Sequence, residues 1–304
     1  MKYNWSVIGH EKELKQIESD IETGNVSHGY LLAGPNSIGK FTVAKKMAGI
    51  LQCNNNFCHE CPTCIQIQKG GHLDTMEILD NGESIGIDEM HTLVERLNMS
   101  KQSNYKICLI QSVERMTVAA ANRFLKTLEE PPSDTIFIMT TNSMRLVLPT
   151  ILSRARVITF RSVSAKYLEE LLKQTYPDKD DESIKQASIF SLGRIGKAVH
   201  FMTNPDSLSQ YIAIYHDVQN FLEFKSVIGR FSYVDSLLED EDTAERKISV
   251  FLDILTHVLR SKSLENPSAA KKYINTLSKV DEHAILLRKN VNKRLVLENL
   301  MLAI

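Results

Sequence analysis

Hydrophobic and polar positions follow two different patterns in the first half of the chain. Short apolar runs, typical of strands buried on both faces, separate stretches in which apolar residues recur every three or four positions. In residues 10–24, for example, Leu14, Ile17 and Ile21 share one helical face. Strands are predicted at residues 30–33, 74–79, 106–110, 136–141 and 155–160, and helices at 10–24, 41–51, 88–99 and 117–129. This alternation predicts a parallel sheet covered by helices on both faces.

The pattern becomes helical in the second half. Residues 164–202 predict a small set of helices interrupted at 193–196, and no strand-like run is found between about Leu208 and Ile304. We therefore expect an α/β domain at residues 1–161 that carries an inserted module at 53–72. A small helical lid at 162–207 and an all-helical C-terminal domain at 208–304 follow it.

Composition limits the class of protein. The 304 residues are 43% hydrophobic and 24% charged, as in soluble globular proteins with a sizeable core. The net charge of −1 provides no overall attraction for nucleic acid, so any DNA contact would depend on a local patch or on partners. The apolar runs are shorter than the roughly 20 residues of a membrane-spanning helix. Because the N-terminus also lacks the apolar run of a signal peptide, we expect a cytoplasmic protein with no membrane contact.

A phosphate-binding loop is predicted between the strand at 30–33 and the helix at 41–51. Residues 34–40 read GPNSIGK, which is the spacing G-x-x-x-x-G-K in the strand–loop–helix context that this motif requires. Backbone N–H groups of such a loop cradle phosphates, and the lysine neutralises them. We assign Gly34, Gly39 and Lys40 to a nucleotide site. The alternative is a glycine turn without a ligand.

The groups that would hold Mg²⁺ at this site are missing. A Ser or Thr should follow Lys40, but Phe41 stands there, and Thr42 is rotated by about 100° around the helix. The strand at 106–110 should end in carboxylates, but Gln111 and Ser112 follow it, and Glu114 lies beyond the strand end. The sequence therefore predicts a degenerate ATPase site. ATP binding without hydrolysis is doubtful.

Four cysteines within twelve residues predict a metal site. They have the spacing C-x4-C-x2-C-x2-C and are Cys53, Cys58, Cys61 and Cys64. Zn²⁺ prefers four tetrahedral thiolates, and with all four positions filled the ion would be structural. An iron–sulfur cluster and a group of buried or reactive thiols are the alternatives. We interpret His59 and His72 as surface residues, and Cys108, inside an apolar run, as a core residue.

Several segments together resemble the clamp-loader subunits of bacterial DNA polymerase III, within the AAA+ family, and most of all its delta-prime type. They are SHGYLLAGP at 27–35, NRFLKTLEEPP at 122–132, TTN at 140–142 and LPTILSR at 148–154. The cysteine insertion after the phosphate-loop helix is similar to the zinc module of the gamma and delta-prime subunits. The resemblance is strong over residues 1–160, fair over the lid and weak in the C-terminal domain.

The resemblance implies a P-loop AAA+ domain, a lid and a C-terminal collar that joins a hetero-pentameric ring with gamma or tau motor subunits and a delta subunit. The ring loads a sliding clamp onto primed DNA at the replisome. Delta-prime subunits do not hydrolyse ATP but donate an arginine to a neighbouring motor subunit, and Arg154 matches that arginine. Ala155 follows it, where the family usually has Cys. Arg194 falls near the lid's sensor position, although we interpret it as a surface arginine.

Two other functions remain open. The chain could be the ATP-hydrolysing gamma or tau motor, but Phe41, Gln111 and Ser112 argue against this, as does the absence of a long extension after Ile304. It could instead be an independent zinc-dependent DNA-binding protein, but the net charge and the lack of a recognition-helix motif disfavour that class. We expect no catalytic activity from the isolated chain.

Overall fold

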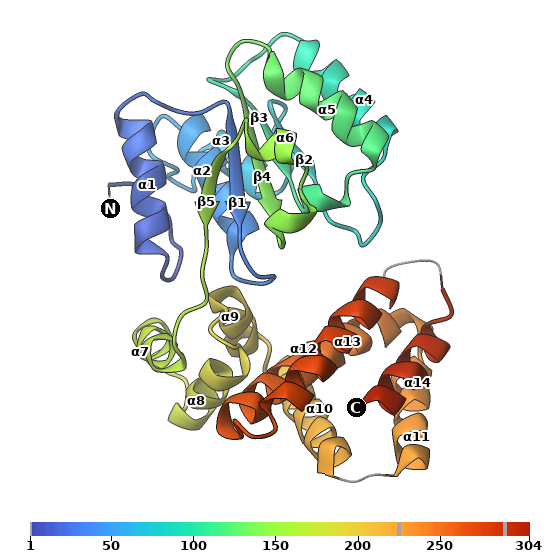
Figure 1. Cartoon of the computed structure of the whole chain (residues 1–304). Helices are drawn as coiled ribbons and strands as arrows, with labels where there is room; N and C mark the ends of the chain where they lie inside the picture. The colour runs from blue at the N-terminus through green and yellow to red at the C-terminus, as the bar shows by residue number, and fades with distance from the viewer. Residues whose placement is uncertain (1, 224–225, 288–290) are drawn as a thin grey trace. The chain divides into compact units, whose positions relative to one another are not determined.

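The computed structural model describes residues 2–223, 226–287 and 291–304. The chain divides into two compact units, Met1–Val199 and His200–Ile304 (Figure 1). The sequence-based boundaries after residues 161 and 207 are finer than this division and remain a proposal.

The first unit is built around a sheet of five parallel strands in the order β2-β3-β4-β1-β5. The strands are β1 (Gly29–Ala33), β2 (Thr75–Ile78), β3 (Lys106–Ile110), β4 (Thr135–Thr141) and β5 (Arg156–Thr159). The three central strands are buried along their whole length. The prediction of a parallel α/β sheet is therefore confirmed.

Alternate side chains of the central strands supply two separate cores. Tyr30 and Leu32 of β1 point into a core shared with α1 (Glu11–Glu22) and α2 (Lys40–Gln52). Leu31, between them, points into a core shared with α4 (Ile87–Asn98), α5 (Val118–Glu129) and α6 (Pro149–Leu152). Because successive strand residues face opposite sides of a sheet, a continuous apolar run is the pattern that two covered faces require.

The predicted elements of this unit all occur, with ends shifted by a residue or two. The sequence missed α3 (Pro62–Gln68), which is too short for a periodic signal, and the single turn of α6. It also missed two 3-10 turns, η1 (Val113–Arg115) and η2 (Met144–Leu146). Three helices close the unit: α7 (Ala165–Thr175), α8 (Asp181–Phe190) and the start of α9 (Ile195–Thr203).

The described residues of the second unit form helices and no strand. The helices are α10 (Pro205–Glu223), α11 (Val227–Leu238), α12 (Glu241–Glu265), α13 (Ala270–Leu287) and α14 (Lys293–Ala303). The long helix α12 packs against α10, α11 and α13, while α14 packs against α11 and α13. Phe251, Ile254 and Leu255 of α12 are buried in this packing.

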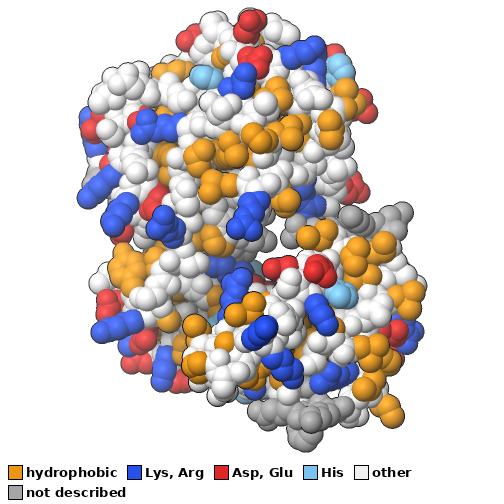
Figure 2. All heavy atoms as spheres, in the orientation of Figure 1, with side chains coloured by type: hydrophobic (Ala, Val, Ile, Leu, Met, Phe, Trp, Pro, Cys, Tyr) orange, Lys and Arg blue, Asp and Glu red, His pale blue; other side chains and the backbone are white. Residues whose placement is uncertain are grey.

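The surface carries charge of both signs. On the face drawn in Figure 2, lysine and arginine side chains are dispersed among acidic and hydrophobic ones, as the net charge of −1 leads one to expect. Within the described ranges, no helix combines the length and apolar character needed to cross a membrane.

Candidate functional site

The predicted phosphate loop connects β1 to α2 at the carboxyl edge of the sheet. A Cβ atom on Gly34 would lie 2.4 Å from the carbonyl oxygen of Phe160, so only glycine fits there. Gly39 has a φ of +110°, which a side-chain-bearing residue rarely adopts. Both glycines of the motif therefore meet backbone requirements of the loop, whether or not it binds a phosphate.

Lys40 is turned back onto its own loop. Its Nζ donates hydrogen bonds to the carbonyl oxygens of Gly34 at 2.8 Å and Pro35 at 2.7 Å, and to Oδ1 of Asn142 at 3.0 Å. Only 6% of the residue is exposed. This burial lowers the pKa of Lys40 to about 8, while the nearby Glu114 carboxylate acts in the opposite direction. The ammonium group thus has three acceptors within its own chain.

Glu114 belongs to this site, although the sequence placed it beyond the end of its strand. The backbone N–H of Asn142 donates to Oε1 of Glu114 at 2.9 Å, so Asn142 joins Glu114 to Lys40. Oε2 of Glu114 is buried and has no hydrogen-bond partner among the described residues. This network forms because the carboxyl ends of β3 and β4 are adjacent. It could be predicted only from the order of the strands, which the sequence pattern does not give.

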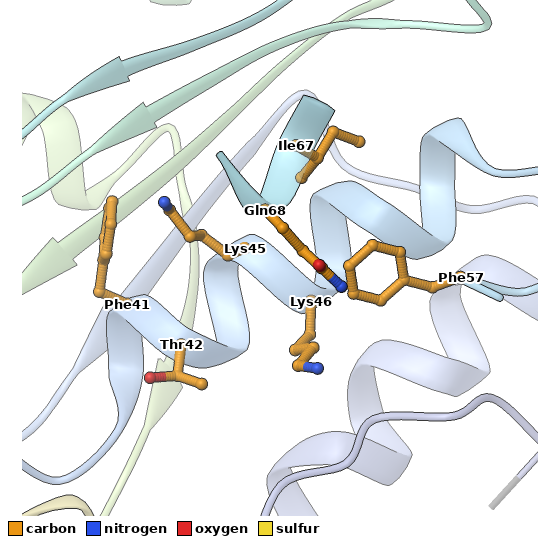
Figure 3. A pocket seen from close by; sticks show the side chains of 7 residues that line it. All are labelled: Phe41, Thr42, Lys45, Lys46, Phe57, Ile67 and Gln68. Carbon is orange, nitrogen blue, oxygen red and sulfur yellow. The ribbon is translucent and has the colours of Figure 1, made fainter. Parts of the chain in front are cut away.

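The two positions that lack metal-binding groups have other contacts. Phe41 lines a cavity of about 250 Å³ between α2 and α3, where Nζ of Lys45 lies 5.7 Å from the centre of its ring. Figure 3 shows that the side chains of Phe41 and Thr42 point in different directions. At the end of β3, Oγ of Ser112 donates to Oδ2 of Asp80 at 2.6 Å, and the Asp80 N–H donates to Gln111 at 3.2 Å. Asp80 also pairs with Nε of Arg115 at 3.2 Å.

Two further elements of the first unit hold the loop. The Lys197 N–H, in the first turn of α9, donates to the carbonyl oxygen of Ser37 at 2.9 Å. A Cβ on Gly196 would lie 2.7 Å from the same oxygen, so the helix end lies directly on the loop. On the other side, Nε2 of the buried His10 lies 3.0 Å from the carbonyl oxygen of Ile38. The phosphate loop is therefore held in place by α9 on one side and by His10 on the other.

The four clustered cysteines meet at one point. Their sulfur atoms all lie within 4.8 Å of one another, and three of the Sγ–Sγ distances, 53–58, 53–61 and 58–64, are 3.9 Å. In a tetrahedron with Zn–S bonds of about 2.3 Å, sulfur atoms are about 3.8 Å apart. A disulfide would require about 2.05 Å. The cluster can hold one metal ion, and its geometry fits tetrahedral thiolate coordination.

The surroundings of the cluster favour thiolates unevenly. Burial acts to raise the pKa of Cys53, but hydrogen bonds from the backbone of Cys58 and Asn55 outweigh it and lower this pKa to about 6. Burial raises the pKa of Cys64. Metal ligation requires all four cysteines as thiolates, so binding of a cation would release protons from the cluster.

The structure corrects the interpretation of one of the two nearby histidines as a surface residue. His72 is only 6% exposed, and its Nδ1 lies 3.0 Å from the hydroxyl of Thr75. His59 packs against Phe57, with ring centres 4.2 Å apart, and its Nε2 is buried. His72 is therefore not a surface residue, whereas His59 is partly exposed. Cys108 is fully buried in the core, as predicted.

Arg154 lies between α6 and β5 at the amino edge of the sheet. Its Nη2 pairs with Oε1 of Glu129, the last residue of α5, at 2.6 Å. Its Nη1 donates to the carbonyl oxygen of Thr150 at 3.1 Å and to Oγ of Ser153 at 3.2 Å. The side chain is 36% exposed, so a partner protein can approach it.

Arg194, which we interpreted as a surface residue, is half-buried. Its Nε donates to the carbonyl oxygen of Ser191 at 3.1 Å, within the turn that connects α8 to α9.

Comparison with known proteins identifies the family. The family model described as "DNA polymerase III, delta subunit" matches residues 9–164, which is half of the chain. A similar fold, with a TM-score of 0.51 and 20% sequence identity, occurs in a DNA polymerase III gamma subunit-related protein from Thermotoga maritima, over 94% of this chain and 97% of that one. This chain belongs to the delta/gamma/tau-type clamp-loader family of DNA polymerase III.

Named relatives include more than one kind of subunit. The DNA polymerase III subunit gamma of Buchnera aphidicola is 26% identical over 93% of this chain and 85% of its own length. The subunit tau of Bacillus subtilis is 32% identical over 53% of this chain, and the subunit delta' of the same organism is 31% identical over 57%. The chain spans only 29% and 54% of these two Bacillus proteins. Identity alone therefore does not separate the subunit types.

Proposed function

We propose that this chain is a delta-prime-type subunit of the clamp loader, which assists ATP-dependent loading of a sliding clamp onto primed DNA without hydrolysing ATP itself. In this role it joins gamma or tau motor subunits and a delta subunit in a hetero-pentameric ring, with the helices of residues 208–304 as the collar. The residues that carry the proposal are those at the Mg²⁺ positions. An active P-loop needs a hydroxyl directly after its lysine and a carboxylate at the end of the adjacent strand.

Neither requirement is met here. Phe41 cannot ligate a cation, and its side chain lines the cavity beside α3. Ser112 at the end of β3 has a hydroxyl instead of a carboxylate, and it is already bonded to Asp80. Glu114 is the one acid within reach of Lys40 among the described contacts, but it is held by Asn142. Because Nζ of Lys40 donates to the carbonyl oxygens of its own loop, the phosphates of a nucleotide would have to compete with these acceptors for it.

A structural Zn²⁺ completes the proposal. The sulfur geometry fits this ion, and two of the ligands are anchored in the core, because Cys53 and Cys64 are buried together with Phe57. Phe57 in turn lies against α2, since a Cβ on Gly49 would come within 2.3 Å of its ring. The ion would thus fix the 53–72 module to the phosphate-loop helix, with no chemical role.

Arg154 is the residue we assign to catalysis in trans. Phosphoryl transfer builds negative charge on the γ-phosphate oxygens, and a guanidinium supplied by a neighbour accelerates it by roughly 10³–10⁵. The match of residues 148–154 to the family motif and the exposure of the side chain support this assignment.

The test uses the isolated chain and the assembled complex. The isolated chain should show negligible Mg²⁺-dependent ATP hydrolysis, and Phe41→Thr alone should not restore it, because the carboxylate at the end of β3 is still missing. Arg154→Ala should lower the ATPase rate of the complex, in part only, since one of several motor sites would lose its arginine. Turnover by the isolated chain that Lys40→Ala abolishes would favour the motor subunit instead.

The control for Arg154→Ala must be chosen from the structure. Arg156 is unsuitable, because it pairs with the buried Asp20 at 2.8 Å and its loss would weaken the fold. Arg96→Ala is a better match. Arg96 is exposed. Among the described residues its side chain donates to the carbonyl oxygen of Leu73, just before β2, at the opposite edge of the sheet from β5. Complexes of equal composition and equal rate for wild type and Arg154→Ala would refute the role in trans.

The gamma or tau motor is the second candidate. It is supported by the gamma and tau relatives at 26–32% identity. The same ATPase measurement on the isolated chain separates the two candidates.

A further inference from the structure

The guanidinium of Arg154 is bound by acceptors of its own chain. Glu129 accepts from Nη2, while the carbonyl oxygen of Thr150 and the hydroxyl oxygen of Ser153 accept from Nη1. A guanidinium has five N–H donors, so these three contacts leave the Nε–H and one Nη2–H for another acceptor. The side available to an incoming phosphate therefore includes the nitrogen that Glu129 already occupies.

The contact with Glu129 differs in kind from the other two. Thr150 and Ser153 offer neutral oxygens, which orient the side chain without changing its charge. Glu129 offers a carboxylate at 2.6 Å, which cancels much of the positive charge that a phosphate would meet. A neighbour's triphosphate must therefore compete with Glu129 for the same cation.

The exposure of the pair makes this competition reversible. The side chains of Arg154 and Glu129 are 36% and 47% exposed, and ion pairs of this kind are weak and easily screened by salt. A triphosphate carries more negative charge than one carboxylate and presents oxygens that suit the guanidinium fork. The pair can hold the arginine in the free subunit and release it when nucleotide is present.

We propose that Glu129 is a positioning residue that holds Arg154 in an intramolecular ion pair, and that ATP bound to the neighbouring subunit must displace this carboxylate to engage the arginine. Glu129 thereby sets the ATP concentration at which the neighbour's site becomes complete. This inference rests on the proposed role of Arg154 in trans. It adds a regulatory contact at the end of α5 that the trans role does not require.

The chain offers a matched control beside Glu129. Glu130 is also exposed and acidic and directly follows it, but no described contact joins its side chain to Arg154. Glu129→Gln and Glu130→Gln each remove one negative charge, at neighbouring positions at the end of α5. Only the first removes the carboxylate that pairs with the arginine.

The experiment measures ATP hydrolysis by the assembled complex as a function of ATP concentration. Glu129→Gln should lower KM for ATP by up to about fivefold, which corresponds to about 1 kcal/mol, the upper range for exposed ion pairs. The turnover at saturating ATP should stay near that of wild type, because the pair is already displaced there. The gain should shrink at high salt and should be absent in Glu130→Gln.

The double variant Glu129→Gln/Arg154→Ala separates this inference from the proposal on which it rests. If the inference holds, the double variant behaves as Arg154→Ala alone. If Arg154→Ala has no effect on the complex, the role in trans is wrong. A second outcome would contradict the inference alone: Arg154→Ala slows the complex, but Glu129→Gln does not lower KM. The same conclusion holds if Glu129→Gln lowers KM equally with and without Arg154, because Glu129 then does not restrain the arginine. A purely structural role for Glu129 would lower the melting temperature of the subunit without lowering KM.

Discussion

Replacing Arg156 tests how much one long-range ion pair stabilises the first unit. Nη2 of Arg156, at the start of β5, lies 2.8 Å from Oδ1 of Asp20 in α1. The other carboxylate oxygen of Asp20 accepts a hydrogen bond from the hydroxyl of Tyr30 at 3.0 Å. The Asp20 side chain is only 6% exposed, whereas that of Arg156 is 45% exposed. Arg156→Ala therefore leaves a buried carboxylate with a single described partner.

The loss of stability expected for Arg156→Ala lies between two limits. Removing one partner of a fully buried ion pair costs about 3–5 kcal/mol, whereas an exposed pair contributes about 0–1 kcal/mol. Because Arg156 is half exposed, water can replace part of its guanidinium, and we expect the free energy of unfolding to fall by about 2 kcal/mol.

Urea unfolding followed by tryptophan fluorescence measures this loss. Trp5 is the only tryptophan of the chain, is 2% exposed, and donates from Nε1 to Glu18 of α1 at 3.0 Å. It therefore reports on the helix that carries Asp20. In an Asp20→Asn background the same arginine replacement should cost less than about 0.5 kcal/mol, because no buried charge remains. If Arg156→Ala alone lowered the free energy of unfolding by less than about 0.5 kcal/mol, the buried Asp20 carboxylate would not depend on Arg156 for its stabilisation.

Three further predictions concern the metal cluster and buried polar groups. Purified protein should contain one zinc per chain by elemental analysis, and Cys64→Ser should remove it and lower the melting temperature of the first unit; metal-free wild-type protein would contradict this. Lys106→Met should lower the free energy of unfolding by about 1–3 kcal/mol in urea titrations, because the buried Lys106 ammonium donates to the carbonyl oxygens of Leu97 and Met99 at the end of α4. Burial, with Asp20 adding to it, raises the pKa of Tyr30 from 10.0 to about 12, so the fold favours its neutral form. The stability that Tyr30 contributes is complete below pH 10 and is lost as pH rises towards 12, and Tyr30→Phe should weaken that alkaline loss.

Local patterns in the sequence were sufficient for the strands and the longer helices of the first unit, and for the motifs of two candidate sites. The glycine spacing of residues 34–40 and the cysteine spacing of residues 53–64 each act over one loop or turn, so neighbouring residues decide the geometry. The parallel sheet also followed from local pattern, because strands buried on both faces need apolar residues at every position. The prediction failed for His72, since nothing beside it in sequence shows that Thr75 and Ser103 enclose it.

The network around Lys40 shows what local pattern could not provide. Asn142 is 102 residues away from Lys40, and Glu114 is 28 residues away from Asn142. They meet because β4 lies between β3 and β1, so that the carboxyl ends of these strands are neighbours. The apolar runs predict that these three segments are strands, but they do not determine the order of the strands in the sheet.

The sequence by itself determined which residues are candidates to bind a phosphate or a metal, because both motifs are defined by residue type and by spacing within one loop. It also shows that Phe41 has no hydroxyl and Ser112 no carboxylate, which are the Mg²⁺-binding groups expected at these two positions. Only the tertiary structure decided which charges meet: Glu129 with Arg154, and Asp20 with Arg156. Such pairs form when the packing of helices on the sheet brings distant side chains within a few ångströms, and that packing depends on the order of the strands, which no single segment encodes.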